Sequence, residues 1–243
     1  MTTLVRITIA LILTLFLSSC GLDINFGNFG SGKKGNGNIT SETREITGNF
    51  TEVSASEGLD VFVTEGTEFE ITVEADDNII DLIATDIRND RLRIHTEENI
   101  GRATKKIFVT LPEVTGLKSS SGAHLSTENR ITSDKLEIDA SSGANVHIEL
   151  EANEVDIDAS SGANLSISGD AGSVYVDASS GANINAKKLM AKICSAEASS
   201  GGNVSVNVSD ALTADASSGG NISYSGDAKV TKKKSVSGSV HKN

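Results

Sequence analysis

One acidic residue recurs at the same place in five successive segments of the chain, each time directly before an Ala-Ser-Ser-Gly sequence. These residues are Asp139, Asp158, Asp177, Glu197 and Asp215. Carboxylate oxygens are the ligands that calcium prefers in proteins, so a row of them could form a ridge that binds calcium or another cation. The alternative is a solvent-exposed row in which mutual repulsion raises the carboxylate pKa values. The calcium nonapeptide Gly-Gly-x-Gly-x-Asp is absent, so we favour the solvated row and expect no cofactor.

The first of the two cysteines points to lipid attachment. Cys20 directly follows Leu17-Ser18-Ser19. Before it lie a single charge at Arg6 and then an apolar run over 7–17. The run is too short to span a bilayer and is typical of a signal peptide. The segment around Cys20 resembles the bacterial lipobox. It predicts a lipoprotein signal peptide over 1–19, lipidation of Cys20, and an exported protein held by its lipid in the outer membrane of a bacterial envelope.

The remaining residues with reactive groups show no pattern of an active site. Cys194 lies in an alternating segment, Ile193-Cys194-Ser195-Ala196, which predicts a small buried side chain without a disulfide partner. The four histidines are scattered, and neither His-Glu-x-x-His nor Gly-x-Ser-x-Gly occurs. We therefore expect a protein that is not an enzyme. A polysaccharide-cleaving enzyme is the alternative, because carboxylates from different segments could meet in space.

A repeat organises the segments that carry these residues. Ala-Ser-Ser-Gly-Ala-Asn begins at Ala140, Ala159 and Ala178, and returns with Gly for the second Ala at Ala198 and Ala216. A diverged first copy covers 119–125, and the period is 18–21 residues. Short alternating segments of Val and Ile lie between the copies and are typical of strands. A near-constant period of this length indicates a solenoid.

The composition gives the fold class. Pro occurs once, Trp is absent and aromatic residues make up 4% of the chain. Stacked Val, Ile, Leu and Ala fill a thin solenoid interior better than large rings do. We predict an all-β fold: a single-stranded, right-handed parallel β-helix with rungs of 18–21 residues, spaced by about 4.8 Å, and a less regular N-terminal β portion.

In this prediction the repeat is a corner of each rung. Gly143 and its equivalents can adopt a positive φ, which a tight turn requires. The Asn that follows should stack into a structural ladder of side chains. Its members are Asn145, Asn164, Asn183, Asn203 and Asn221, with His124 in the first copy.

The chain divides into parts of different composition. Residues 20–40, rich in Gly and Asn, predict a flexible tether from Cys20 to a head domain over 41–243. Within the head, 41–117 is the irregular β part, with one short helix expected over 79–87, and 118–226 holds the repeat rungs. The segment 227–243 predicts a basic cap at the end of the solenoid. Its lysines are Lys229, Lys232, Lys233, Lys234 and Lys242.

Charge restricts the possible partners. The formal net charge is −12, which argues against nucleic acid and against direct binding to an anionic membrane surface. Membrane attachment is therefore expected through the lipid on Cys20 alone. Surface glycans and other envelope proteins remain as candidate partners.

The order of features resembles a bacterial domain family of unknown function, the putative auto-transporter adhesin, head GIN domain. The matching segments are 50–53, 58–63, 71–74, 90–94, 109–112 and the recurrent Ser-Gly-Ala corners. The resemblance covers about 46–225 and implies a β-helical envelope lipoprotein with adhesin-like surface presentation. It supplies no catalytic or binding residues. A polysaccharide-binding or polysaccharide-cleaving β-helix and a periplasmic structural or regulatory partner are the alternatives.

Overall fold

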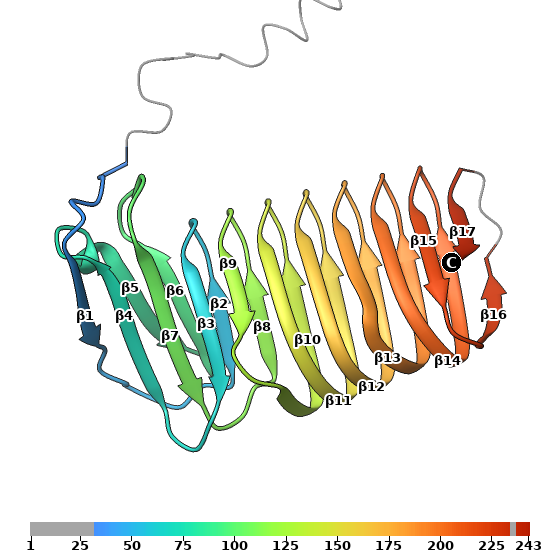
Figure 1. Cartoon of the computed structure of the whole chain (residues 1–243), viewed down its shortest axis with the longest axis horizontal. Coiled ribbons are helices and arrows are strands. Elements are labelled where there is room, and N and C mark those ends of the chain that lie inside the picture. Colours follow the sequence, from blue (N-terminus) through green and yellow to red (C-terminus); the bar gives the residue numbers. More distant parts are fainter. Residues whose placement is uncertain (1–31, 234–236) are drawn as a thin grey trace, which may run out of the picture. The chain divides into compact units, whose positions relative to one another are not determined.

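The computed structural model describes residues 32–233 and 237–243, which form a stack of parallel rungs (Figure 1). Four long strands make the most regular rungs, and they lie side by side in sequence order. They are β11 (Asn145–Ala159), β12 (Asn164–Ala178), β13 (Asn183–Ala198) and β14 (Asn203–Ala216). All three pairings among them are parallel. The predicted parallel β-helix is confirmed.

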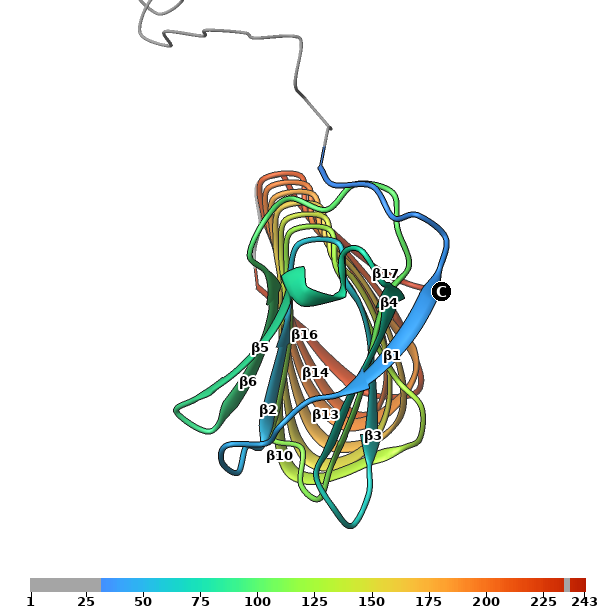
Figure 2. The same cartoon turned by 90° about the vertical axis from the view of Figure 1, so that its left-hand side faces the viewer.

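Each long strand bends once and contributes to two facing layers (Figure 2). In β11 inward and outward residues alternate until Asn153 and Glu154, which are both exposed. This break marks the bend, because a bend lets two successive side chains point outward. We call the outer side of the first halves the asparagine face, that of the second halves the acidic face, and the side with the bends the bend edge.

Shorter strands extend the stack at both ends. Toward the N-terminus β9 (His124–Thr127) and β10 (Ile131–Ala140) form the next rung, and β8 (Gly116–Ser119) stacks on the second half of β10 one rung further out. At the other end lie β15 (Asn221–Ser225), β16 (Lys229–Lys232) and β17 (Ser239–Lys242). Because β16 pairs in parallel with β14, and β17 with β15, the basic tail continues the solenoid as one more short rung.

The N-terminal part uses the same two layers in a different order. Its strands are β1 (Ile39–Thr43), β2 (Glu52–Ala55), β3 (Asp60–Glu65), β4 (Glu70–Asp76), β5 (Ile83–Arg88), β6 (Arg91–Thr96) and β7 (Lys105–Leu111). The rung of β2 and β3 lies between β6 and β7 on one side and β8 and β9 on the other. Along the chain, the inner rung of β2 and β3 therefore comes before the outer rung of β6 and β7. The antiparallel strands β1, β4 and β5 close the end of the stack.

The helix expected over 79–87 is wrong. A 3-10 turn at Ile80–Leu82 is followed directly by β5, which pairs antiparallel with β6. Ile83, Thr85 and Ile87 are β-branched and favour a strand once a neighbouring edge is available. Tertiary pairing therefore overrides the helical spacing of the apolar residues.

The core lies between the two layers. One inward column runs through five rungs in register, and all of its side chains are buried. It consists of Ile138, Ile157, Val176, Ala196 and Ala214. Its side chains become smaller toward the C-terminus, whereas the neighbouring inward column returns to a large side chain at Leu212, so the columns fill the space between the layers together.

The Ser-Ser-Gly corner is a tight turn with two residues at positive φ. In the first regular copy φ is 52° at Ser142 and 74° at Gly143, and Ala144 N donates to Ser141 O at 3.1 Å. Gly143 N also donates to Ser161 O of the next rung at 3.0 Å. The expected positive φ of the glycine is confirmed, and the preceding serine shares it.

The last two corners replace Ala by Gly for a steric reason. A Cβ on Gly202 would lie 2.1 Å from the carbonyl oxygen of Ala178, and one on Gly220 would lie 2.1 Å from that of Ala198. Such contacts are impossible without a shift of the backbone. The Gly-Gly pairs therefore allow a closer approach of neighbouring corners.

The strained serine leads to a stability prediction. A left-handed residue other than glycine costs about 1–2 kcal/mol, and Asn tolerates this conformation better than Ser. Ser142→Asn should therefore raise the free energy of unfolding by about 0.5 kcal/mol. Ser142→Val should lower it, because a β-branched residue is poorly compatible with positive φ. Urea unfolding of the full-length protein measures both, and changes of the same sign would contradict the turn geometry.

Candidate functional site

The parallel register brings the five acidic residues of the repeat into one column. Asp139 pairs with Asp158, Asp158 with Asp177, Asp177 with Glu197, and Glu197 with Asp215. Adjacent strands in a sheet lie about 4.8 Å apart, so neighbouring carboxylates repel one another. The structure confirms that these residues stack.

Lysines close this column at both ends. Lys118 occupies the same column one rung before Asp139 and forms an ion pair with it. At the other end Lys233 Nζ lies 3.3 Å from Asp215 Oδ2 and 3.8 Å from Glu197 Oε1. The terminal carboxylates are thus neutralised by residues from β8 and from the chain beyond β16. The sequence shows Lys233 as part of the basic tail, but it does not place either lysine in the column.

The two carboxylates in the middle have a different environment. Burial raises the pKa of Asp158, and repulsion from Asp156, Asp139 and Asp177 raises it further. Burial likewise raises the pKa of Asp177. Both line a groove of about 320 Å³ on the acidic face, beside the hydroxyl-bearing Ser141 and Ser160. The expected rise in carboxylate pKa is therefore found at these two positions.

The acidic column shows no metal-binding cluster. Calcium takes six to eight oxygen ligands at about 2.3–2.6 Å, and each rung contributes one carboxylate to the column. Within residues 32–233 and 237–243, no group of three or more His, Cys, Asp and Glu side chains is arranged to hold a metal ion. Cation binding stays the alternative interpretation of this ridge.

The bend edge carries a longer groove, of about 940 Å³. Its floor is formed by small apolar side chains, one from each of four rungs: Ala152, Ala171, Ala191 and Val208. Polar side chains including Glu151, Asp170, Lys192 and Asn207 also line it. The groove follows the stack because each rung repeats the same bend.

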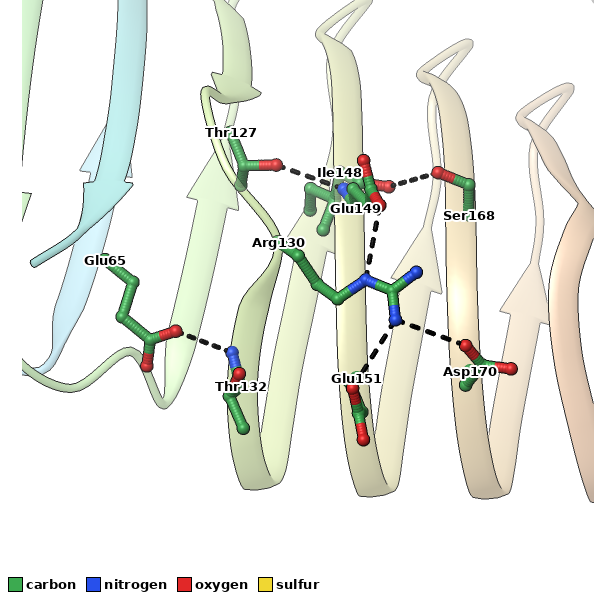
Figure 3. Close-up of polar contacts among 9 residues, drawn as sticks. All are labelled: Glu65, Thr127, Arg130, Thr132, Ile148, Glu149, Glu151, Ser168 and Asp170. Atoms are coloured by element: carbon green, nitrogen blue, oxygen red, sulfur yellow. Dashed lines mark hydrogen bonds and ion pairs between the residues drawn. The ribbon is translucent and has the colours of Figure 1, made fainter.

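Arg130 links three rungs beside this groove (Figure 3). Its Nε donates to Glu149 Oε1 at 3.2 Å, and its Nη1 lies 3.4 Å from both Glu151 Oε2 and Asp170 Oδ2. These hydrogen bonds and charges raise the pKa of Arg130. A single guanidinium thus neutralises carboxylates from neighbouring rungs, and it is the only Arg after residue 119.

The asparagine ladder forms as expected. Asn183 Nδ2 donates to Asn164 Oδ1 at 3.2 Å, and Asn203 Nδ2 donates to Asn183 Oδ1 at 3.1 Å. Asn145 pairs in register with Asn164 and also with His124 of β9. The ladder therefore stabilises the stack through side chains as well as through backbone.

Sequence reasoning missed two aromatic residues on this face. Phe62 and Phe108 are in-register partners on β3 and β7, and their rings stack with centroids 5.1 Å apart. The signal was present in the alternation, because Phe62 lies between Val61 and Val63, which are both buried. A residue at that position of a strand must point outward.

Cys194 has the properties of a packing residue. Its side chain is buried, and burial raises the pKa of its thiol to about 12. The thiolate is the reactive form of cysteine, so this group is inert at neutral pH. Cys20, the predicted lipidation site, lies outside the described residues.

Fold and surfaces together define a parallel β-helix protein with one acidic face and one face of amides and hydroxyls. Residues 49–228 match the family described as "Putative auto-transporter adhesin, head GIN domain", and the chain belongs to this family. The resemblance seen in the sequence is confirmed. In the described part of the chain, no helix combines the length and hydrophobicity that crossing a bilayer requires.

Solved structures from Bacteroides and Parabacteroides species share the fold. A putative adhesin from Bacteroides fragilis is 20% identical, with 86% of this chain and 99% of that chain covered and a TM-score of 0.76. A putative adhesin from Parabacteroides distasonis is 18% identical, with coverage of 87% and 99% and a TM-score of 0.72. A putative lipid binding protein from the same species is 18% identical, with coverage of 86% and 98% and a TM-score of 0.69. No curated protein matches the chain.

The acidic column leads to a prediction about pH. Because the folded-state pKa of Asp158 is raised, its carboxylate destabilises the fold at pH values above that pKa, and the penalty disappears below the unfolded value of 3.8. Asp158→Asn should therefore raise stability at pH 7 by a few tenths of a kcal/mol, and the gain should vanish near pH 3.5. Urea midpoints at the two pH values measure this change.

Asp139→Asn is the matched control for that experiment. It removes a carboxylate that is paired with Lys118, so it should lower the urea midpoint at pH 7. An equal gain from Asp158→Asn at both pH values would contradict the raised pKa.

The Arg130 network predicts a salt-dependent effect. Arg130→Gln leaves Glu149, Glu151 and Asp170 without their shared cation, so it should lower the urea midpoint at low ionic strength. The difference from wild type should shrink at about 1 M salt, where the Debye length is about 3 Å. Lys135→Gln, which breaks one pair with Glu154, should have a smaller effect. An effect of Arg130→Gln that does not change with salt would contradict the network.

Proposed function

We propose that this protein is a lipid-anchored, non-catalytic protein of the bacterial cell envelope whose β-helix presents extended faces for adhesion or assembly. The observation that carries the proposal is the form of its surface. Each outer column repeats one kind of side chain over successive rungs, as the acidic column and the asparagine ladder do. Such columns provide many equivalent weak contacts to an extended partner. Membership of a family of putative adhesins supports the same reading.

The titratable groups also fit binding better than catalysis. A catalytic site brings different groups together, such as a nucleophile, a base and a group that orients the base. The carboxylates with raised pKa, Asp158 and Asp177, instead lie in a row of like groups, and the Cys194 thiol is buried. Nothing in this arrangement requires a cofactor.

The anchor is the second part of the proposal. Residues 1–19 act as a lipoprotein signal peptide, the lipid on Cys20 holds the protein in the outer membrane, and a tether that starts at Cys20 leads to the solenoid. The tether is shorter than the expected 20–40, because Lys33 already bridges to Ile100 and β1 begins at Ile39. The described chain enters at the end of the stack that β1 closes (Figure 1). Attachment at that end leaves both faces and the bend edge open to partners.

Metabolic labelling tests the anchor. Labelled palmitate should enter the wild-type protein and the Cys194→Ala variant, and should not enter Cys20→Ala, because only Cys20 follows the lipobox-like segment. The readout is the label in the immunoprecipitated protein and its partition between membrane and soluble fractions. Unchanged labelling of Cys20→Ala would overturn the anchor, and turnover of a uronic-acid polymer by the purified protein would overturn the non-catalytic role.

A further inference from the structure

Next to the corner, the asparagine face of the repeat rungs carries two uncharged columns, although the chain as a whole is strongly acidic. Glu149 and Lys188 lie in the next column, further from the corner. Two outer columns next to the corner run from β9 to β15 without Asp, Glu, Lys or Arg. They consist of His124, Asn145, Asn164, Asn183, Asn203 and Asn221, and of Ser126, His147, Ser166, Asn185, Ser205 and Ser223. The acidic face of the same rungs carries a carboxylate on every one of them from Asp139 to Asp215. The two faces therefore suit partners of different charge.

This neutral face keeps hydrogen-bonding capacity. Asn145, Asn164, Asn183 and Asn203 are exposed. Within the ladder the Oδ1 atoms of Asn164 and Asn183 each accept one hydrogen bond from the next rung. An amide oxygen has two lone pairs, so each can accept a further bond from a ligand. A shallow groove of about 320 Å³ runs along these residues from His124 to Asn185.

The Phe62–Phe108 pair continues the same face toward the N-terminal end. Phe62 pairs in register with Ser126, so the rings adjoin the column of hydroxyls. Phe108 is 39% exposed, and the two rings stack with an interplanar angle of 18°. At this centroid distance the two rings overlap face to face and do not lie side by side on the sheet, so the apolar surface that they offer is the exposed rim of the pair. We call the pair the aromatic platform; a partner of this face meets it first and a row of amides and hydroxyls beyond it.

We propose that this face binds a neutral polysaccharide, with its chain lying along the stack. A sugar ring presents an apolar face of C–H groups, which packs against the exposed rim of the Phe62–Phe108 pair, and hydroxyls at its edges, which exchange hydrogen bonds with the Asn and Ser columns. The repeat of about 4.8 Å between rungs offers equivalent contacts to successive sugar units. This inference rests on the proposed binding function and names its partner class.

Charge selects the neutral polymer over other occupants. An anionic polysaccharide is repelled by the net charge of −12. A cationic partner would find the acidic column on the opposite face, whereas Glu149 on this face is already paired with Arg130. A purely apolar partner would bury the amides of the ladder without replacing the hydrogen bonds that water gives them. Sugar hydroxyls replace those bonds.

Binding isotherms of the full-length protein in detergent test this proposal. Soluble mannan, dextran and a β-linked glucan serve as neutral probes, and polygalacturonate serves as the anionic one. We expect at least one neutral polymer to bind, and Phe108→Ala to weaken that binding about tenfold, through loss of ring stacking and apolar contact. Asn164→Asp should weaken it as well, because it places a carboxylate in the ladder.

Tyr175→Ala and Ser195→Asp on the acidic face are the matched controls and should leave affinity unchanged. Tyr175 is 38% exposed, close to the value for Phe108. Circular dichroism verifies that each variant folds, and Asn164→Asp tests the face if Phe108→Ala does not. The proposal is overturned if no neutral polymer binds, if only polygalacturonate binds, or if the controls weaken binding equally.

Two further outcomes distinguish a polysaccharide partner from a protein partner, and the partner from the lipid anchor. A protein crosslink in cells that is lost in Asn164→Asp, without any binding of a neutral polymer, would assign the face to a protein and overturn the proposal. Palmitate labelling is independent of the glycan isotherms. A protein that is labelled at Cys20 but binds no neutral polymer would retain its anchor and lose only the assigned partner.

Discussion

The structure depends on the parallel backbone pairing between rungs. This pairing places equivalent residues directly above one another, about 4.8 Å apart, so any residue type that recurs with the period becomes a column. A recurrent Asn gives a ladder of amide hydrogen bonds, and a recurrent Ala at the corner gives a buried column. The same register also stacks recurrent carboxylates, which repel. One constraint thus produces both the stabilising and the destabilising features of the surface.

The two faces handle this constraint differently. Amides are donors and acceptors at once, so the asparagine column satisfies itself from rung to rung. Carboxylates only accept, so the acidic column needs cations, and it receives Lys118 and Lys233 at its ends. In the middle of the column, burial raises the pKa values of Asp158 and Asp177, and repulsion from neighbouring carboxylates adds to the rise at Asp158. At the bend edge, Arg130 likewise neutralises carboxylates from neighbouring rungs.

The repeat region could be predicted from the sequence because its interactions join residues that lie one repeat apart. The corners, the strand alternation and the stacking of Asp139 with Asp158 all follow from a spacing of 18–21 residues. The N-terminal part could not be predicted in this way, because the stacking order β6, β2, β8 depends on pairings between segments that are distant in the sequence. Pairing with β6 likewise makes residues 83–88 a strand, although their apolar residues follow helical spacing. The Phe62–Phe108 platform joins β3 to β7 and was hidden for the same reason.

The residue types in the surface columns change at one place along the stack, and this place is the most informative about function. Along the asparagine face the repeat supplies amides and hydroxyls, and the aromatic platform appears only where the N-terminal rungs join it, at Phe62 and Ser126. On the acidic face the change is from Lys118 to Asp139 at the same junction. Both faces thus alter at the boundary between the irregular and the regular rungs. The regular rungs supply length and equivalent contacts, and the N-terminal rungs supply the residues that distinguish one end of the stack from the other.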